Sequence, residues 1–387
     1  MPQKVADSEM KRRQYAVLAA MEKEGIDCVV MYKFGDRFGG IMRYLTDDTG
    51  GYPPSAIMSK DGVALFKMGW ASENEFPELK PAGDKLPMGT WNHPYLPNNT
   101  FAQNVVPESM VKYIKKFGYK KVGWLNLQFI PASIYIYLTQ NLPGVEFVDF
   151  TTPVDEIRRV KSPYEIERWM KCVELHDQLM AAVPALMRPG INCLDLGLEI
   201  DALAAKLGVI EFQNRVINFA RGDQYFNLAS GERFQQGDYV YVLVEVAGPG
   251  GEWGELGRLH ALGVEPNEHW KQITRNHVTL QDAVAAACVP GAIPQDIARM
   301  CNKMLKDFGY KEERRINIHG QTYDIVDLPA FVEGDTAPLL EHEFFTIHPG
   351  AVAPPYIMNH TDNFLVEKGG ARLLNKTPRE IVYVPVY

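Results

Sequence analysis

The second half of this chain contains, twice over, a pair of helices separated by Pro-Gly, and this repetition constrains the fold more than any other feature. The four helices are expected at residues 162–187, 194–207, 270–288 and 293–308. Pro189-Gly190 divides the first pair and Pro290-Gly291 the second. Proline cannot continue a helix, and glycine is the usual residue just past a helix end, so each pair reads as two separate helices. The repetition indicates a weak internal duplication of one α/β unit.

The domain junction is predicted just before this duplication. Ser162-Pro163-Tyr164-Glu165 is a capping box with proline at the first helical position. The Ser162 side chain can accept from a free amide of the first turn while Glu165 reaches back. We therefore expect an N-terminal domain at 1–155 and a C-terminal domain at 156–387.

The N-terminal part is predicted to be an α/β domain. A helix is expected at 10–24, a buried strand follows at 28–32, and Asp61-Gly62 predicts a hairpin between two apolar runs. The Gly- and Pro-rich stretch 68–99 is expected to be a long loop, and it contains Trp70 and Trp91. These aromatic residues could line a substrate pocket, or they could pack on the surface of their own domain.

Composition excludes several classes of protein. The net charge of −8 argues against a nucleic-acid-binding protein, because phosphate contacts need clustered Lys and Arg. The sequence has no run of about 18 apolar residues that would predict a membrane helix. The five cysteines are scattered and odd in number, which predicts neither a disulfide framework nor a zinc knuckle. We expect a cytoplasmic protein with reduced cysteines.

Four further segments carry a resemblance to a known family. They are the junction phrase 154–167, the strand that begins at Gly237-Asp238, the strand with His319-Gly320, and Thr346-Ile347-His348-Pro349-Gly350. They are similar to the pita-bread family, which includes creatinase, aminopeptidase P, prolidase and methionine aminopeptidase. The resemblance covers nearly the whole chain. It implies an N-terminal creatinase/prolidase-like α/β domain, followed by a pita-bread catalytic domain with a curved antiparallel sheet, an α/β (α+β) fold overall.

The resemblance also implies a set of site residues. Metal enzymes of the family use two aspartates, one histidine and two glutamates to hold two divalent ions. The second aspartate corresponds to Glu255, and the first falls on Val244 or, after a slip of one residue, on Glu245. The histidine corresponds to His319. His348 stands where the family has its first glutamate, and Thr361 where it has its second.

Other side chains are candidates for substrate binding. Arg258 and Tyr323 could bind a substrate carboxylate, and Thr361, Trp70 and Trp91 could line the pocket. Arg258 could instead be a structural ion-pair partner. The family's peptidases and creatinase carry a further histidine about ten residues before the Gly-Asp strand, and residues 220–228 contain none. That departure counts against peptide hydrolysis and creatine hydrolysis.

The loss of carboxylates favours a non-peptidase enzyme without metal. It would hydrolyse or eliminate a C–N or similar bond of a small molecule, with His319, His348, Glu255 and Glu245 as acid-base groups. One alternative is a hydrolase or lyase with a single zinc or iron ion on Glu255, His319 and His348. Others are a non-catalytic binding protein and an Xaa-Pro peptidase. The resemblance further implies a homodimer in which the N-terminal domain closes the partner's site.

Overall fold

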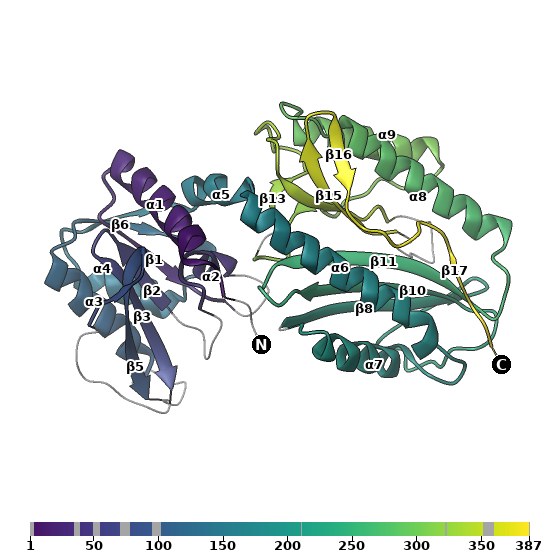
Figure 1. The fold of residues 1–387 in the computed structure, drawn as a ribbon, viewed down its shortest axis with the longest axis horizontal. Coiled ribbons are helices and arrows are strands. Elements are labelled where there is room, and N and C mark those ends of the chain that lie inside the picture. Colours follow the sequence, from purple (N-terminus) through teal and green to yellow (C-terminus); the bar gives the residue numbers. More distant parts are fainter. Residues whose placement is uncertain are drawn as a thin grey trace. The chain divides into compact units, whose positions relative to one another are not determined.

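The computed structural model describes residues 4–34, 39–48, 55–69, 78–94, 102–209, 211–321, 323–350 and 360–386. The chain divides into two compact units (Figure 1), Gln3–Arg158 and Arg159–Tyr387, and residues 1–2 are grouped with the second. Each unit is considered by itself below. Both combine sheets with helices, which confirms the predicted α/β class.

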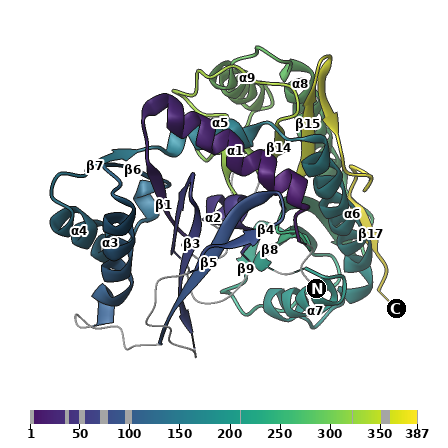
Figure 2. The ribbon, with the colours of Figure 1, turned by 60° about the vertical axis from the view of Figure 1, so that its left-hand side comes forward.

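The N-terminal unit is built on one seven-stranded sheet in the order β4-β5-β3-β2-β1-β6-β7. Its strands are β1 Cys28–Tyr32, β2 Ser55–Ser59, β3 Gly62–Gly69, β4 Lys80–Ala82, β5 Lys85–Pro94, β6 Lys121–Trp124 and β7 Glu146–Asp149. Its helices are α1 Asp7–Glu24, α2 Gly40–Thr46, α3 Val105–Phe117, α4 Ala132–Asn141 and α5 Thr151–Arg159. Helices α3 and α4 pack on one face, and α1 and α2 lie on the other (Figure 2). The predicted hairpin is confirmed, because β2 and β3 pair antiparallel around Asp61-Gly62.

The expectation of a long loop at 68–99 is wrong for residues 80–82 and 85–94, where β4 and β5 lie. Strand β5 contains Pro87 and Gly89, which weaken a strand pattern in the sequence. It forms because it pairs in parallel with β3. Trp91 is buried in the core of this unit, where its ring centroid is 6.0 Å from that of Phe66. This unit's core thus accounts for Trp91 without a substrate pocket, whereas Trp70 lies outside the described residues.

The C-terminal unit has two five-stranded sheets, ordered β17-β11-β10-β8-β9 and β13-β12-β14-β15-β16. The strands of the first are β8 Glu211–Arg221, β9 Gln224–Asn227, β10 Tyr239–Ala247, β11 Trp253–Leu262 and β17 Val382–Val384. The strands of the second are β12 Ile318–Gly320, β13 Asp327–Ala330, β14 Phe344–Ile347, β15 Asp362–Glu367 and β16 Gly370–Leu373. Among the described residues, the strand pairs of both sheets are antiparallel except for β11 with β17. A bridge between Gly257 and Thr361 joins the two sheets.

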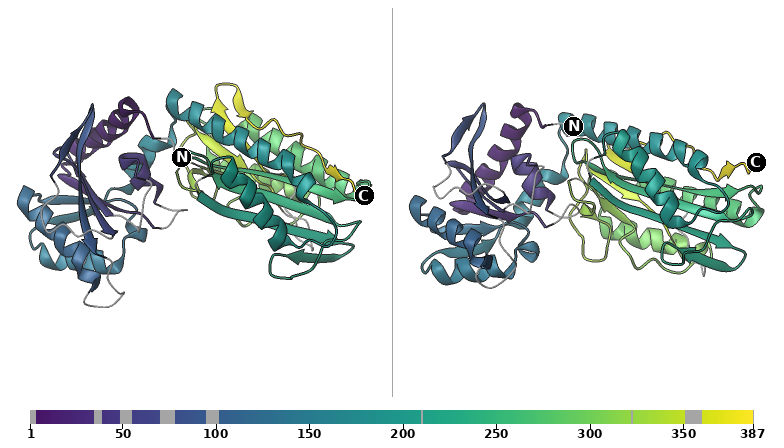
Figure 3. Two further views of the ribbon diagram at one scale, coloured as in Figure 1. Left: turned by 60° about the horizontal axis from the view of Figure 1, so that its bottom comes forward. Right: turned by 90° about the horizontal axis from the view of Figure 1, so that it is seen from below.

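Each sheet has its own pair of helices, as the repeated Pro-Gly pattern predicts. The helices are α6 Pro163–Leu186, α7 Cys193–Lys206, α8 Glu268–Ala287 and α9 Pro294–Asp307. Helix α6 lies along β11 and β10 (Figure 3) and α7 packs on β8, whereas α8 packs on β16 and α9 on α8. The predicted capping box is present at α6, where the Ser162 hydroxyl accepts from the Glu165 amide at 3.2 Å.

Strand β10 separates two environments by alternation. Its even-numbered residues, Val240 to Val246, join the apolar core beneath α6 and α7. Tyr239, Tyr241 and Leu243 face the opposite side. Successive side chains of a strand point to opposite faces, so a polar residue at an odd position of β10 faces away from the α6–α7 core. Whether a carboxylate of β10 has an odd or an even number therefore determines which face of the sheet it lies on.

Helix α8 carries a histidine that makes the stability of this unit depend on pH. His277 is completely buried, neither ring nitrogen has a hydrogen-bond partner among the described residues, and burial lowers its pKa to about 4. The unfolded chain binds a proton below about pH 6.5 while the folded chain refuses it, so stability falls as the pH drops toward 4.

We expect His277→Leu to reduce the loss of unfolding free energy between pH 7 and pH 5 by about 2 kcal/mol. Urea titrations of wild type and variant at both pH values measure this difference. The control is His269→Ala, because His269 is exposed on the same helix. If the two variants show the same pH dependence as the wild type, His277 is not a buried neutral group.

Candidate metal centre

Three buried side chains from three different strands or strand ends converge in the C-terminal unit. Glu255 comes from β11, His319 from β12, and His348 directly follows β14. One potential ligand atom from each lies within 4.8 Å of the others. The antiparallel register explains the meeting of the two histidines. His319 pairs with Thr346, and the His348 amide donates to the Asn317 carbonyl at 2.9 Å, so the two rings share one face.

The two imidazoles face each other through their Nε2 atoms, which are 2.9 Å apart. The Nδ1 of His319 lies 3.0 Å from the Gly320 carbonyl oxygen, so that nitrogen carries the proton and donates it. Its Nε2 is left with a lone pair, as in metal-binding histidines whose other nitrogen donates to a carbonyl. Burial lowers the pKa of His319 to about 4, and burial together with the neighbouring His319 lowers the pKa of His348 well below its usual range. Both imidazoles are therefore neutral near pH 7, and a neutral imidazole has a nitrogen lone pair that can bind a metal ion.

Glu255 is held by contacts to its side chain and its backbone. Its Oε1 accepts from Gln321 Nε2 at 2.6 Å and lies 3.5 Å from His319 Nε2. Its Oε2 is buried without a hydrogen-bond partner among the described residues. Burial, and then the charge of Glu245, raise the pKa of Glu255 well above its usual range. The Asn363 side chain bonds both backbone groups of Glu255, accepting from its amide at 3.1 Å and donating to its carbonyl at 2.6 Å.

The register of β10 decides between the two candidates for the first acidic position. Glu245 lies directly opposite Glu255, and directly opposite residues of an antiparallel pair point to the same face. Val244 belongs instead to the apolar core under α6 and α7. The slip of one residue considered in the sequence therefore places Glu245 on the side of the histidines. Glu245 is only partly buried.

Tyr241 and Thr361 lie beside these carboxylates. The Tyr241 hydroxyl is 3.0 Å from Thr361 Oγ1, and both residues are completely buried. Gly257 makes this approach possible, since a Cβ there would stand 2.2 Å from the Tyr241 hydroxyl oxygen. Burial raises the pKa of Tyr241, and the charges of Glu245 and Glu255 raise it further. The phenol is thus a neutral hydrogen-bond donor.

Arg258, expected to bind substrate, is instead part of an internal network. Its guanidinium is completely buried and donates to Asp362 Oδ1 at 2.6 Å. Its other donors bond the carbonyl oxygens of Gly257, Thr361, Thr377 and Pro378. Arg258 is three residues after Glu255 in β11, so the two side chains point to opposite faces of the sheet. Arg258 is therefore not placed on the side of the candidate metal centre. The structure favours the alternative reading of Arg258 as a structural ion-pair partner.

Tyr323 also lies in a different environment from the one expected. Its ring packs on Trp169 with a centroid distance of 5.7 Å, and its hydroxyl lies 3.5 Å from Glu252 Oε1. Glu252 forms a buried ion pair with Arg168 of α6. Tyr323 thus lies beside a structural ion pair.

Three residues of the centre escaped sequence reasoning. Gln321 follows His319 by two positions, so the period of two residues in a strand was a usable signal. Asn363 follows Thr361 by two positions, so the same period was a usable signal for it. Arg315 precedes β12, and its charge influences Glu255, His348 and Tyr241, yet it carries no motif.

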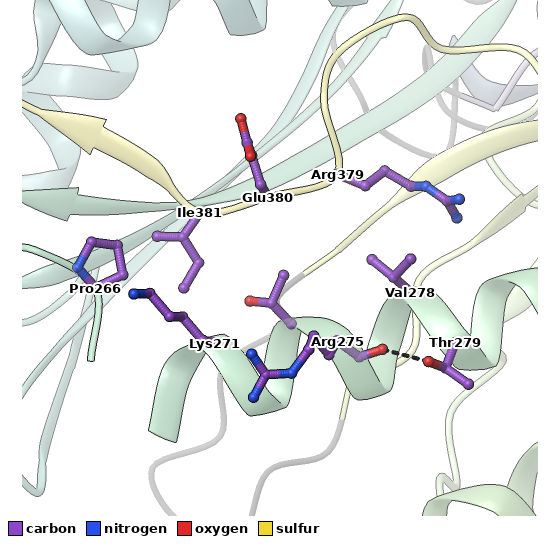
Figure 4. Close-up of a pocket in the computed structure, with 9 residues that line it drawn as sticks. Pro266, Lys271, Arg275, Val278, Thr279, Arg379, Glu380 and Ile381 are labelled. Atoms are coloured by element: carbon purple, nitrogen blue, oxygen red, sulfur yellow. Dashed lines mark hydrogen bonds between the residues drawn. The ribbon is translucent and has the colours of Figure 1, made fainter. Parts of the chain in front are cut away.

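A separate groove of about 450 Å³ lies between α8 and the segment before β17 (Figure 4). Its charged lining residues are Lys271, Arg275, Arg379 and Glu380. Arg275 is paired with Glu268, and Arg379 with Asp282. None of the converging residues lines this groove, and we do not assign the chemistry to it.

The residues of the centre fit one divalent cation. Two neutral imidazoles and one carboxylate form a recognised set for zinc or iron(II). Such a ligand set needs a carboxylate oxygen that no other group holds and a histidine whose second nitrogen keeps its proton. Glu255 Oε2 has no hydrogen-bond partner among the described residues, and His319 Nδ1 donates to the Gly320 carbonyl oxygen. For a second cation, Glu245 faces the same side as Glu255, whereas Thr361 stands in place of a glutamate and its hydroxyl is engaged by Tyr241.

Sequence comparison assigns both parts of the chain. The profile of metallopeptidase family M24 matches residues 167–376, and that of the creatinase/prolidase N-terminal domain matches residues 13–160. A protein from Pyrococcus horikoshii named Xaa-Pro dipeptidase is 23% identical over 242 residues, which are 61% of this chain and 68% of that protein.

Solved structures share the fold. An X-Pro aminopeptidase from Thermotoga maritima superposes with a TM-score of 0.80 at 16% identity, covering 96% of this chain and 99% of that one. A prolidase from Pyrococcus horikoshii gives 0.76 at 19% identity, covering 96% and 100%. These likenesses confirm the pita-bread fold. None of the helices in the described ranges combines the length and apolar character that crossing a bilayer requires.

These findings overturn two expectations. A reaction without metal is wrong, because the matched family is one of metallopeptidases. A non-peptidase hydrolase or lyase is wrong as well, because the relatives are named Xaa-Pro dipeptidases. Carboxylates are missing at the positions of His348 and Thr361, and this loss alone favoured a reaction without metal. His348, however, is itself a metal donor and lies beside His319 and Glu255.

Proposed function

The chain belongs to metallopeptidase family M24, and from this premise we propose that it hydrolyses Xaa-Pro dipeptides with one divalent cation held by Glu255, His319 and His348. The convergence of these three buried side chains is the observation that carries the proposal. The names of the relatives supply the substrate class.

The cation, when bound, polarises the substrate carbonyl and makes water more acidic. Glu245 is suited to proton transfer, because it faces the same side as Glu255 and is only partly buried. In the proposed reaction it takes a proton from the attacking water and delivers it to the leaving proline nitrogen. The neutral Tyr241 hydroxyl can donate a hydrogen bond to the developing oxyanion. Gln321 and Asn363 hold Glu255 in place.

The test begins with metal-free protein titrated with Zn²⁺, Fe²⁺ or Mn²⁺ in a calorimeter. We expect a stoichiometry of one ion per chain, with zinc or iron bound more tightly than manganese, because imidazole ligands suit those metals. Hydrolysis of Ala-Pro, followed by the release of free proline, is expected only after metal is added. No hydrolysis of any Xaa-Pro dipeptide with any of these metals would refute the proposed function.

Family resemblance also predicts a homodimer whose N-terminal domain closes the partner's site. This assembly stays a prediction. Sedimentation equilibrium tests it directly, and a single species at the mass of one chain would contradict it.

A further inference from the structure

The side chain of Gln321 contacts one of the three proposed metal ligands. Gln321 is completely buried, and its Nε2 donates to Glu255 Oε1 at 2.6 Å. Its own Oε1 has no hydrogen-bond partner in the described part of the chain. A buried amide oxygen without a partner is costly, so the gain in stability from one hydrogen bond explains this side chain poorly. The contact with Glu255 therefore points to a role at the centre.

The backbone of Glu255 is held independently of Gln321. The Asn363 side chain accepts from the Glu255 amide at 3.1 Å and donates to its carbonyl at 2.6 Å. Asn375 Oδ1 in turn accepts from the amide and from the side chain of Asn363, both at 2.9 Å, and Asn375 Nδ2 donates to Asp177 of α6 at 3.3 Å. With its backbone fixed, the Glu255 carboxylate moves mainly by rotation of its side chain, and the bond to Gln321 restricts that rotation.

The two carboxylate oxygens of Glu255 are therefore not equivalent. Oε1 is engaged by the Gln321 amide, whereas Oε2 is buried and lacks a hydrogen-bond partner among the residues that the structure describes. A cation held by His319 and His348 would then find one free carboxylate oxygen. Two imidazole nitrogens and one oxygen are three protein donors, which leaves the fourth position of a tetrahedral zinc site open for water or substrate.

A carboxylate with both oxygens free would favour other cations. Binding through Oε1 and Oε2 together would supply a fourth protein donor atom and close a tetrahedral zinc site. It would suit a cation such as Mn²⁺, which prefers oxygen ligands and takes about six of them. The hydrogen bond from Gln321 therefore acts on the choice of metal.

We propose that Gln321 is a positioning residue that restricts Glu255 to one metal-binding oxygen and thereby makes the centre select zinc over manganese. This inference rests on the proposed function and deepens it, because it concerns the cation of the same centre. Gln321 acts through Glu255 and has no part in the cleavage of the peptide bond.

The experiment measures the affinity for two cations in the absence of substrate. Metal-free wild type and Gln321→Met are titrated with Zn²⁺ and with Mn²⁺ in a calorimeter. Methionine keeps the unbranched shape of glutamine but cannot donate to Glu255. We expect the affinity for Zn²⁺ to fall about 10- to 100-fold, as when other hydrogen-bond partners of metal ligands are removed. The affinity for Mn²⁺ should stay the same or rise, so the ratio of the two affinities should fall by at least about tenfold.

Gln281 of α8 provides a matched control. It is also completely buried, its Nε2 donates to the Ile347 carbonyl at 3.0 Å, and its Oε1 likewise has no partner within the described ranges. Gln281→Met removes an amide of the same kind one residue away from His348, yet leaves the bond to Glu255 intact. We expect it to lower the free energy of unfolding and to keep the wild-type ratio of Zn²⁺ to Mn²⁺ affinity.

A spectroscopic measurement on the wild type needs no substitution at all. Co²⁺ serves as a probe of coordination, because its four-coordinate complexes absorb visible light much more strongly than its six-coordinate ones. We expect strong visible bands for Co²⁺-loaded wild type and Gln281→Met, and weaker bands for Gln321→Met. Weak bands in the wild type would overturn the inference even if Gln321→Met does not fold.

The possible outcomes separate this inference from the proposed function. A folded Gln321→Met protein with the wild-type affinity ratio would overturn the role of Gln321 and leave the peptidase function standing. An equal loss of selectivity in Gln281→Met would do the same. If no Xaa-Pro dipeptide is hydrolysed, yet the ratio changes only in Gln321→Met, the positioning role stands and the peptidase function fails. A wild type that binds none of these cations would overturn both.

Discussion

Replacement of His319 by alanine is expected to abolish stoichiometric metal binding and to lower kcat/KM for Ala-Pro by about a thousandfold or more. His319 is the central member of the candidate centre, because its Nε2 lies 2.9 Å from His348 Nε2 and 3.5 Å from Glu255 Oε1. Two donors would remain without it, and the contribution of a catalytic cation is worth several kcal/mol. Metal content and steady-state kinetics of the purified variant measure both effects.

Two further variants test whether the loss of activity in His319→Ala comes from misfolding. His319→Gln keeps more of the side-chain volume, so it should fold even if the alanine variant does not. His269 is an exposed histidine of α8 and is not one of the converging residues. The His269→Ala variant should therefore behave as the wild type. A His319→Gln protein that is folded, metal-loaded and fully active would show that the centre lies elsewhere.

The second large effect is expected on stability. Arg258→Ala should lower the free energy of unfolding by about 3–5 kcal/mol, because it leaves a buried carboxylate without its partner. Asp362 and Arg258 are both completely buried, and Arg258 Nη2 lies 2.6 Å from Asp362 Oδ1. Four carbonyl oxygens lose a donor at the same time. Urea denaturation at pH 7 measures the change.

The control for Arg258 is an exposed pair of the same type. Arg372 and Glu367 are 2.6 Å apart, but their side chains are 47% and 42% exposed. Arg372→Ala should cost at most about 1 kcal/mol, as solvent screens such pairs. The folded fraction of Arg258→Ala should keep a KM close to that of the wild type. A large rise in the KM of Arg258→Ala, with an unchanged free energy of unfolding, would show that Arg258 binds substrate.

Much of the centre could be predicted from residue patterns. His319, His348 and Glu255 were singled out by their positions in strand phrases, and the structure brings these three together. Asp362, which directly follows Thr361, points away from the centre and pairs with Arg258. The donor positions followed from the resemblance to the pita-bread family, and the alternation of side chains along a strand explains why residues at those positions can meet.

Other features depended on register and could not be read from the chain. The choice between Val244 and Glu245 required the pairing of β10 with β11, since a slip of one residue exchanges the two faces. Strand β5 was hidden by Pro87 and Gly89, and only its pairing with β3 reveals it. Tyr241 and Thr361 are 120 residues apart, so nothing local announces their hydroxyl contact.

The sequence by itself determined the duplicated helix pairs and the α/β class, because helix stops, capping and strand alternation are local properties of the chain, and its resemblance to the pita-bread family singled out the donor residues. Only the tertiary structure decided which donors meet and that Arg258 belongs to an internal network. The reason is physical. Metal binding and charge repulsion depend on distances of a few ångströms between strands that are far apart in sequence, and those distances are set by sheet register and packing.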